Sequence, residues 1–76
     1  MKKHGVSFET AQYVFNDPLY MEKYDALHSI FEDRWKVIGF YNEFITVIAK
    51  FLPGDTARII SAWKSKPLEI EEYKNG

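Results

Sequence analysis

The chain has 76 residues, of which 46% are hydrophobic and 17% aromatic, and it carries a formal net charge of −1. This length suits one compact domain over residues 1–76, the composition excludes a disordered chain, and the balanced charge gives no global sign of nucleic-acid binding. The sequence contains no cysteine and no apolar stretch of the about 20 residues that span a bilayer, which excludes disulfides, thiolate chemistry and transmembrane helices.

The first predicted element is a helix over residues 7–15. Ser7 suits the start of the helix because its hydroxyl can accept a hydrogen bond from a free backbone amide of the first turn. Apolar residues then recur at helical spacing, namely Phe8, Ala11 and Phe15. The segment Asn16–Pro18 ends the helix, since proline disfavours helical geometry in the residue before it and asparagine and aspartate favour turns.

A meander of β-strands is expected next. Its segments are rich in β-branched and aromatic residues and are separated by turn-forming residues. Asn42 and Glu43 connect two long segments as a hairpin, and Pro53–Thr56 form the next turn. The expected strands are Leu19–Lys23 at an edge, Arg34–Tyr41, Phe44–Leu52 and Ala57–Ala62, with a loop over Tyr24–Phe31.

The last predicted element is a short helix that begins near Pro67. Proline suits a first helical turn, and Leu68, Ile70 and Tyr73 follow at compatible spacing. The whole order predicts an α+β fold, in which a small antiparallel β-meander of three to four strands is flanked by an N-terminal and a C-terminal helix.

The segment Phe44–Leu52 has two different faces. One face carries only apolar side chains, namely Ile45, Val47, Ala49 and Phe51, whereas the other face is mixed and includes Lys50. We expect the apolar face to lie under the helices. The mixed face would then be open and available to a ligand.

Motifs for nucleotide cofactors, metals and common hydrolases are absent. The chain has no glycine-rich phosphate loop, no dinucleotide fingerprint and no Gly-x-Ser-x-Gly motif. Its histidines, His4 and His28, lie far apart, so we expect neither a cofactor nor a metal. A core of this size contributes about 3–5 kcal/mol at most, so we expect the chain to associate with a partner or with copies of itself.

Several short motifs together resemble those of the BrnT-type toxins. The resemblance extends from Lys3 to about Tyr73, nearly the whole chain. The residues that carry it are Lys3-His4-Gly5-Val6-Ser7-Phe8-Glu9, Ala11, Val14-Phe15, Asp17-Pro18, His28-Ser29, Glu32, Arg34, Ile38-Gly39, Arg58-Ile59-Ile60-Ser61-Ala62, Glu69 and Tyr73. The first of these motifs in combination with Arg58–Ala62 makes the match specific.

The resemblance implies a RelE-like fold and a cytoplasmic ribonuclease toxin that inhibits translation by cleaving RNA. It also implies a cognate antitoxin, which neutralises the toxin and carries the DNA-binding module. Operator DNA would then be a partner only through the antitoxin.

The chain departs from the family pattern in three places. Trp63 stands where the family usually has an arginine, and Lys66 replaces a small residue before the last helix. The family usually has a further strand and most of a helix before the motif that begins here at Lys3. These departures favour an alternative, a homologue that keeps the antitoxin-binding surface but does not cleave RNA. A second alternative is an unrelated small interaction module.

Cleavage of RNA without a metal needs a base, an acid and cations that stabilise the charge on the phosphoryl group. Arg34 and Arg58 are the candidates for the cations, because each stands at the start of a predicted strand and a guanidinium matches two phosphate oxygens. The alternative for each is a solvated arginine paired with a nearby carboxylate such as Glu32, Asp33 or Asp55.

The remaining candidates are weaker and each has an ordinary alternative. His28 titrates near neutrality and could act as acid or base, whereas a lone histidine in a loop is usually solvated. Lys3 and His4 match the Lys-His-Gly motif of the family, where a cation could hold phosphate. Candidates for RNA binding are Lys36, Lys50 and Lys64, with solubility as their alternative. The acidic residues Glu69, Glu71 and Glu72 of the last helix are interpreted as a solvated face, with docking of a basic antitoxin segment as the alternative.

Overall fold

The computed structural model describes residues 5–29, 32–54 and 56–75. Within this part of the chain, four strands form one antiparallel sheet in the order β1-β2-β3-β4. The elements are α1 (Phe8–Ala11), the 3₁₀-helix η1 (Gln12–Asn16), β1 (Met21–Tyr24), the 3₁₀-helix η2 (Ala26–His28), β2 (Trp35–Tyr41), β3 (Glu43–Leu52), β4 (Thr56–Lys64) and α2 (Pro67–Asn75). The predicted α+β fold, with a meander between two terminal helices, is confirmed.

The N-terminal helix forms where the sequence predicts it. The backbone amide of Thr10 donates to Ser7 Oγ at 3.0 Å, so the hydroxyl caps the first turn of α1. The chain then tightens into η1, which ends at Asn16 just before the proline turn. No helix in the described part of the chain is long and apolar enough to cross a membrane.

The strands also agree with the sequence, with differences at their ends. The edge strand β1 includes Tyr24, and part of the expected loop over Tyr24–Phe31 forms η2. β4 is longer than the predicted Ala57–Ala62. The β2–β3 hairpin turns at Asn42, which has a φ of 66°, a left-handed conformation that asparagine tolerates better than most residues.

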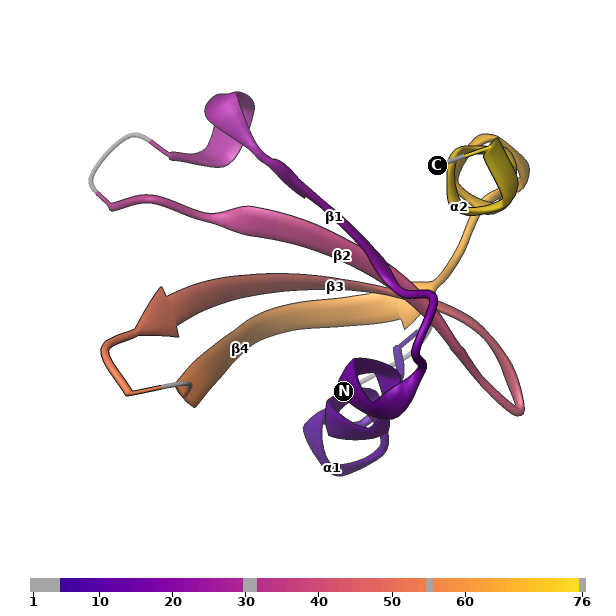
Figure 1. Cartoon of the computed structure of the whole chain (residues 1–76), viewed down its shortest axis with the longest axis horizontal. Coiled ribbons are helices and arrows are strands. Elements are labelled where there is room, and N and C mark those ends of the chain that lie inside the picture. Colours follow the sequence, from indigo (N-terminus) through magenta and orange to yellow (C-terminus); the bar gives the residue numbers. More distant parts are fainter. Residues whose placement is uncertain (1–4, 30–31, 55, 76) are drawn as a thin grey trace.

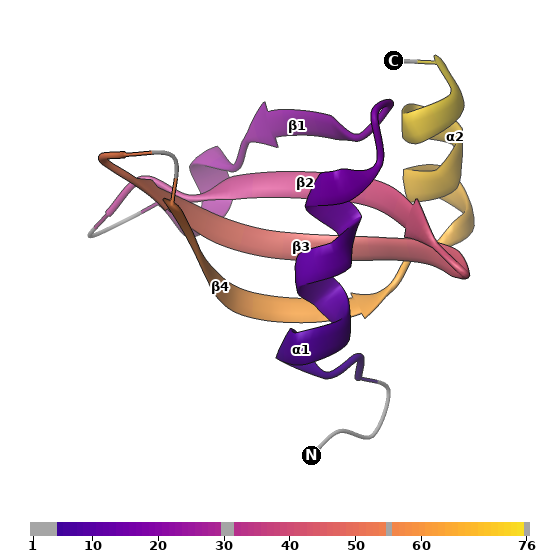
Figure 2. The ribbon, with the colours of Figure 1, turned by 60° about the horizontal axis from the view of Figure 1, so that its bottom comes forward.

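The core lies between α1, η1 and one face of the sheet, which we call the α1 face (Figure 2). Ile45, Val47 and Ala49 of β3 are on this face and are completely buried, whereas Phe51, which the prediction includes, is 38% exposed near the end of the strand. The core comprises Ala11, Val14, Val37, Ile45, Val47 and Ala49, with Val6, Phe15, Tyr20, Ile59 and Ala62 packed around it. The prediction that this face lies under a helix is therefore correct for α1.

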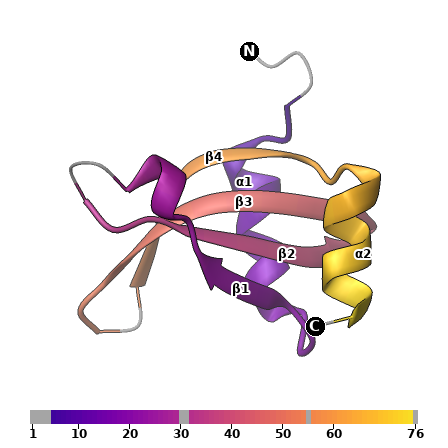
Figure 3. The same ribbon diagram turned by 90° about the horizontal axis from the view of Figure 1, so that it is seen from above.

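The same prediction is wrong for α2, which packs on the opposite face, here called the α2 face (Figures 1 and 3). The physical reason is charge. α2 carries Glu69 and Glu72, and Lys23 and Lys36 lie on the mixed face of the sheet, within 3.2–3.9 Å of these carboxylates. The mixed face is consequently covered at one end and free of α2 at the other.

A bulge in β4 changes which residues share a face. Ile48 pairs with Ser61 whereas Ala49 pairs with Ile59, so one extra residue, Ile60, stands between two normal pairs. Simple alternation would place Arg58 and Trp63 on opposite faces. Because of the bulge, both lie on the α2 face.

Asp17 joins three distant parts of the chain. Its carboxylate accepts hydrogen bonds from the Leu19 amide at 2.9 Å, the Phe40 amide at 2.9 Å and the hydroxyl of Tyr73 on α2 at 2.6 Å. Burial opposes ionisation of Asp17, but these three bonds outweigh it and hold its pKa below the usual value. The hydrogen bond to Asp17 also raises the pKa of the Tyr73 hydroxyl. Asp17 thereby fixes the end of α2 against the sheet.

Close packing of η1 on the sheet predicts the effect of one added methyl group. A Cβ at Gly39 would lie 2.5 Å from Val14 Cγ1 and 3.1 Å from the Val14 carbonyl oxygen. We expect Gly39→Ala to lower the free energy of unfolding by about 1–3 kcal/mol because of overpacking. Urea denaturation followed by circular dichroism measures this.

A Val14→Ala background provides the control for Gly39→Ala. The loss should be smaller there, since the closest clashing atom is gone. An equal loss in both backgrounds would contradict the proposed packing.

Candidate functional site

Three cations form a row across the α2 face, here called the cation row: Arg34, Lys50 and Arg58. Lys50 on β3 pairs directly with Arg58 on β4. Arg34 immediately precedes Trp35, the partner of Ala49, so alternation places Arg34 beside Lys50. α2 contacts the opposite end of β3, and the row therefore lies on the part of the face that α2 leaves free (Figure 3).

The carboxylate of Glu32 lies between two members of the cation row. Lys50 Nζ donates to Glu32 Oε1 at 3.0 Å, and Arg34 Nη2 donates to Glu32 Oε2 at 3.4 Å. The hydrogen bond from Lys50 is the main reason that the pKa of Glu32 lies below its usual value. Each of the three side chains is about one-third exposed, so solvent screens these ion pairs.

Glu32 does not neutralise the whole row. Arg58 is exposed and has no ion pair with any residue that the structure describes. The buried Nε of Arg34 has no hydrogen-bond acceptor in the described part of the chain. Counted over the described side chains, the row therefore presents more positive than negative charge, as a surface that binds phosphates requires.

The 3₁₀-helix η2 lies on the same side of the sheet as α2, at the other end (Figures 1 and 3). The backbone of His28 belongs to η2. The side chain of His28 is outside the described part of the structure, and so are Lys3 and His4 entirely. The cation row is thus bordered by the segment that contains one of the predicted catalytic residues.

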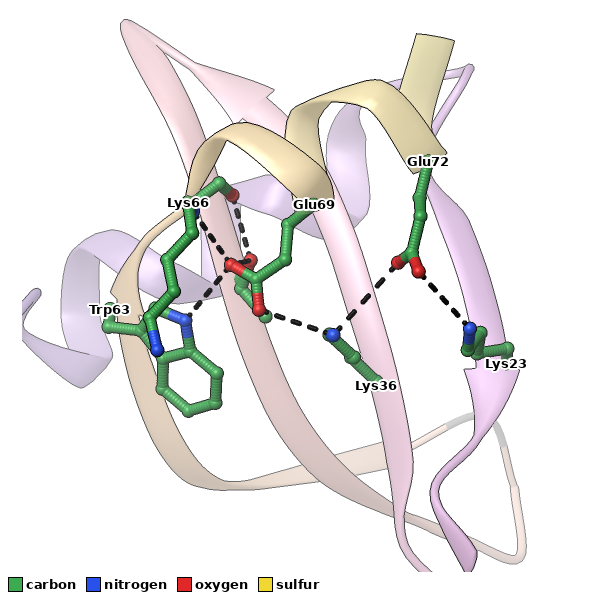
Figure 4. Close-up of polar contacts among 8 residues, drawn as sticks. Lys23, Lys36, Trp63, Lys66, Glu69 and Glu72 are labelled. Atoms are coloured by element: carbon green, nitrogen blue, oxygen red, sulfur yellow. Dashed lines mark hydrogen bonds and ion pairs between the residues drawn. The ribbon is translucent and has the colours of Figure 1, made fainter. Parts of the chain in front are cut away.

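A second polar cluster lies beneath α2 and is centred on Glu69 (Figure 4). Glu69 Oε1 accepts from the Lys66 amide at 2.8 Å, from Thr46 Oγ1 at 3.0 Å and from Trp63 Nε1 at 3.2 Å, and Lys36 Nζ lies 3.2 Å from Oε2. The residue is only 7% exposed. The interpretation of Glu69 as part of a solvated face is therefore wrong.

Glu69 is charged although it is buried. Burial opposes ionisation, but the hydrogen bonds from the Lys66 amide, Thr46, Trp63 and Lys36 outweigh it, and the pKa of Glu69 lies below its usual value. In a capping box, the side chain of the third helical residue accepts a hydrogen bond from the backbone amide just before the helix. Glu69 accepts this bond from the Lys66 amide. Glu69 therefore both caps the first turn of α2 and attaches α2 to the sheet.

Trp63 takes part in this cluster through its indole N–H. Trp63 pairs with Thr46 in the sheet register, which places both side chains on the α2 face, and Trp63 is part-buried. The isolated bridge between Gly5 and Trp63 also joins the chain before α1 to the free edge of β4. The residue that replaces the usual arginine therefore has a structural contact of its own.

The predicted lysines are divided between the two faces. Lys50 belongs to the cation row, and Lys36 lies on the same face but is already paired with the carboxylates of α2. Lys64 pairs with Ile45 in the sheet register, which places it on the α1 face, where it lies 3.7 Å from Glu43. The structure thus brings together Arg34, Lys50 and Arg58 but not Lys64.

Sequence analysis named Glu32 only as a carboxylate that could pair with an arginine, as it does with Arg34, and it named Glu69 only as part of a solvated face. Glu69 is the third residue of α2, where a capping box has its glutamate, but Lys66 in place of serine or threonine removes the other half of that signal. Glu32 has no comparable signal, because its link to Lys50 crosses 18 residues. Among the described residues, no group of three or more histidine, aspartate or glutamate side chains is arranged to hold a metal ion.

The comparisons with known proteins give one match. The model of a protein family described as "Ribonuclease toxin, BrnT, of type II toxin-antitoxin system" matches residues 1–69. No curated protein and no solved structure matches the chain.

The charged state of Glu69 predicts a pH-dependent stability. Because its pKa in the folded chain is below the usual 4.5, Glu69 contributes stability at neutral pH that is lost as the pH falls from about 4.5 through the folded pKa. We expect Glu69→Gln to lower the free energy of unfolding by about 1–3 kcal/mol at pH 7 and by less as the pH is lowered. Urea denaturation at a series of pH values measures the difference.

Glu71→Gln on the same helix is the matched control, since Glu71 is exposed and undergoes the same change of charge. Its effect should be small and almost independent of pH. A constant difference between Glu69→Gln and the parent from pH 7 to pH 3 would contradict the role of Glu69.

Proposed function

We propose that this chain, which belongs to the family of BrnT ribonuclease toxins of type II toxin–antitoxin systems, cleaves RNA at its cation row without a metal ion. The observation that carries the proposal is the alignment of Arg34, Lys50 and Arg58 on the part of the sheet that α2 leaves free. Family membership supports the proposed activity, and the arrangement of the cation row supports the proposed location of the site.

The proposed chemistry follows from the charge that develops during cleavage. Attack of a ribose 2′-oxygen on phosphorus concentrates negative charge on the phosphoryl oxygens, and rigidly held cations stabilise it. Arg34 and Arg58 have this role in the proposal, while Lys50 holds a neighbouring phosphate. His28 is the proposed group for proton transfer, and Lys3 and His4 are proposed to hold phosphate.

The biological setting is part of the same proposal. Cleavage of RNA would inhibit translation in the cytoplasm, and a cognate antitoxin would neutralise the toxin and carry it to operator DNA. Residues 1–76 would act as a single toxin domain of RelE-like architecture. The small core is consistent with stabilisation by that partner or by a second copy.

One observation favours a second function, which is binding of the antitoxin without cleavage. Trp63 occupies a position where the family usually has an arginine, and its indole is engaged by Glu69 beneath α2. If that arginine is required for cleavage, the chain keeps a stable fold and a docking surface but no activity.

Expression in growing cells distinguishes these functions. We expect the parent chain to arrest growth with breakdown of RNA, and we expect Arg34→Ala and Arg58→Ala to abolish both effects. Loss of one stabilising group costs about 10²–10³-fold in rate. Growth curves and the integrity of RNA from the same cells provide the measurement.

Lys66→Ala is the matched control, since it removes an exposed cation outside the cation row and should remain toxic. Circular dichroism of each purified variant checks that it is folded, and an unfolded Arg34→Ala or Arg58→Ala would mark that arginine as structural. A parent chain that is folded and harmless would overturn cleavage and leave antitoxin binding as the function.

A further inference from the structure

We infer that Arg34 and Lys50 form a phosphate-binding site that the chain fills with its own carboxylate, Glu32, until a phosphodiester of RNA replaces it. Two anionic oxygens of one group are each bound to a separate cation, at 3.0 Å from Lys50 and 3.4 Å from Arg34. A phosphodiester also offers two anionic oxygens to two donors, so it can take over the same contacts.

The exposure of the three side chains allows the exchange. They are 29–34% exposed, which leaves the ion pairs accessible to an anion from solution and weakened by solvent. Glu32 itself precedes β2 and is outside the hydrogen-bonded ladder of the sheet. Its side chain can therefore turn away without breaking a contact between strands.

Glu69 provides the contrast that identifies Glu32 as the exchangeable carboxylate. Glu69 also binds a cation of the α2 face, Lys36, but it is 7% exposed and is held by further bonds from a backbone amide, a hydroxyl and an indole. Release of Glu69 would leave several buried donors unpaired, which is costly. Release of Glu32 leaves only two cations unpaired, and each of these is already about one-third exposed.

The free groups of the row support the same assignment. Arg58 next to Lys50 has no ion pair with a described residue, so it can meet an incoming phosphate first. A phosphodiester held there lies next to the pair that Glu32 occupies. In this respect the inference rests on the proposed function, because RNA is the phosphodiester that the row would bind.

The test compares Glu32→Gln with Asp33→Asn, which makes the same change of charge at the next residue. Asp33 is exposed and accepts a hydrogen bond from Tyr24 rather than from the cation row. Two probes are titrated by calorimetry at several salt concentrations: inorganic tripolyphosphate, and a short single-stranded RNA with 2′-O-methyl groups that block cleavage.

We expect Glu32→Gln to bind both probes about three- to tenfold more tightly than Asp33→Asn does, with a steeper salt dependence, because two more cations are free to bind phosphate. Equal binding by the two variants, or weaker binding by Glu32→Gln, would overturn the inference. Tighter binding of tripolyphosphate without any binding of RNA would support the exchange and count against the proposed function.

A measurement on the unchanged protein keeps the inference testable if Glu32→Gln does not fold. Carbon-13 NMR follows the titration of the Glu32 carboxyl with and without saturating tripolyphosphate. Release from Lys50 and Arg34 should move its midpoint upward, since those contacts lower its pKa. An unchanged midpoint in the saturated protein would show that the carboxylate stays in place and would overturn the exchange.

Discussion

Successive side chains of β3 point to opposite faces of the sheet, and this alternation separates two surfaces with different physical character. Ile45, Val47 and Ala49 are fully buried against the N-terminal helix and make up the centre of the core. The alternate residues of β3 face the other way, where Thr46 binds Glu69 and Lys50 binds Glu32. Since a shift of one residue would exchange the two surfaces, the register of this strand maintains both the core and the charged face.

The charged face combines two carboxylates in different environments. Glu69 is buried and bound by several donors, so its charge is used to attach α2. Glu32 is part-exposed and bound only by the ends of long side chains, so in our proposal a phosphate can take its place beside the two cations. The same chemical group is structural at one end of the face and exchangeable at the other because its burial and its number of donors differ.

The local signals in the sequence predict the elements well and their long-range arrangement less well. The Ser7 cap, the meander and a helix from Pro67 follow from residue types and spacing. The face on which α2 packs does not, because ion pairs between segments far apart in the sequence decide it. The sequence also does not predict that Arg58 and Trp63 lie on the same face, since this depends on the bulge in β4.

The hydroxyl of Tyr73 on α2 binds Asp17, which precedes β1, across 56 residues. The strands pair only with their neighbours in sequence, so the sheet can assemble progressively while the chain is being synthesised. α2 cannot dock in this way, because Glu69 and Tyr73 bind groups on β2, on β3 and on the segment before β1. The α2 face is therefore completed only after these strands have paired.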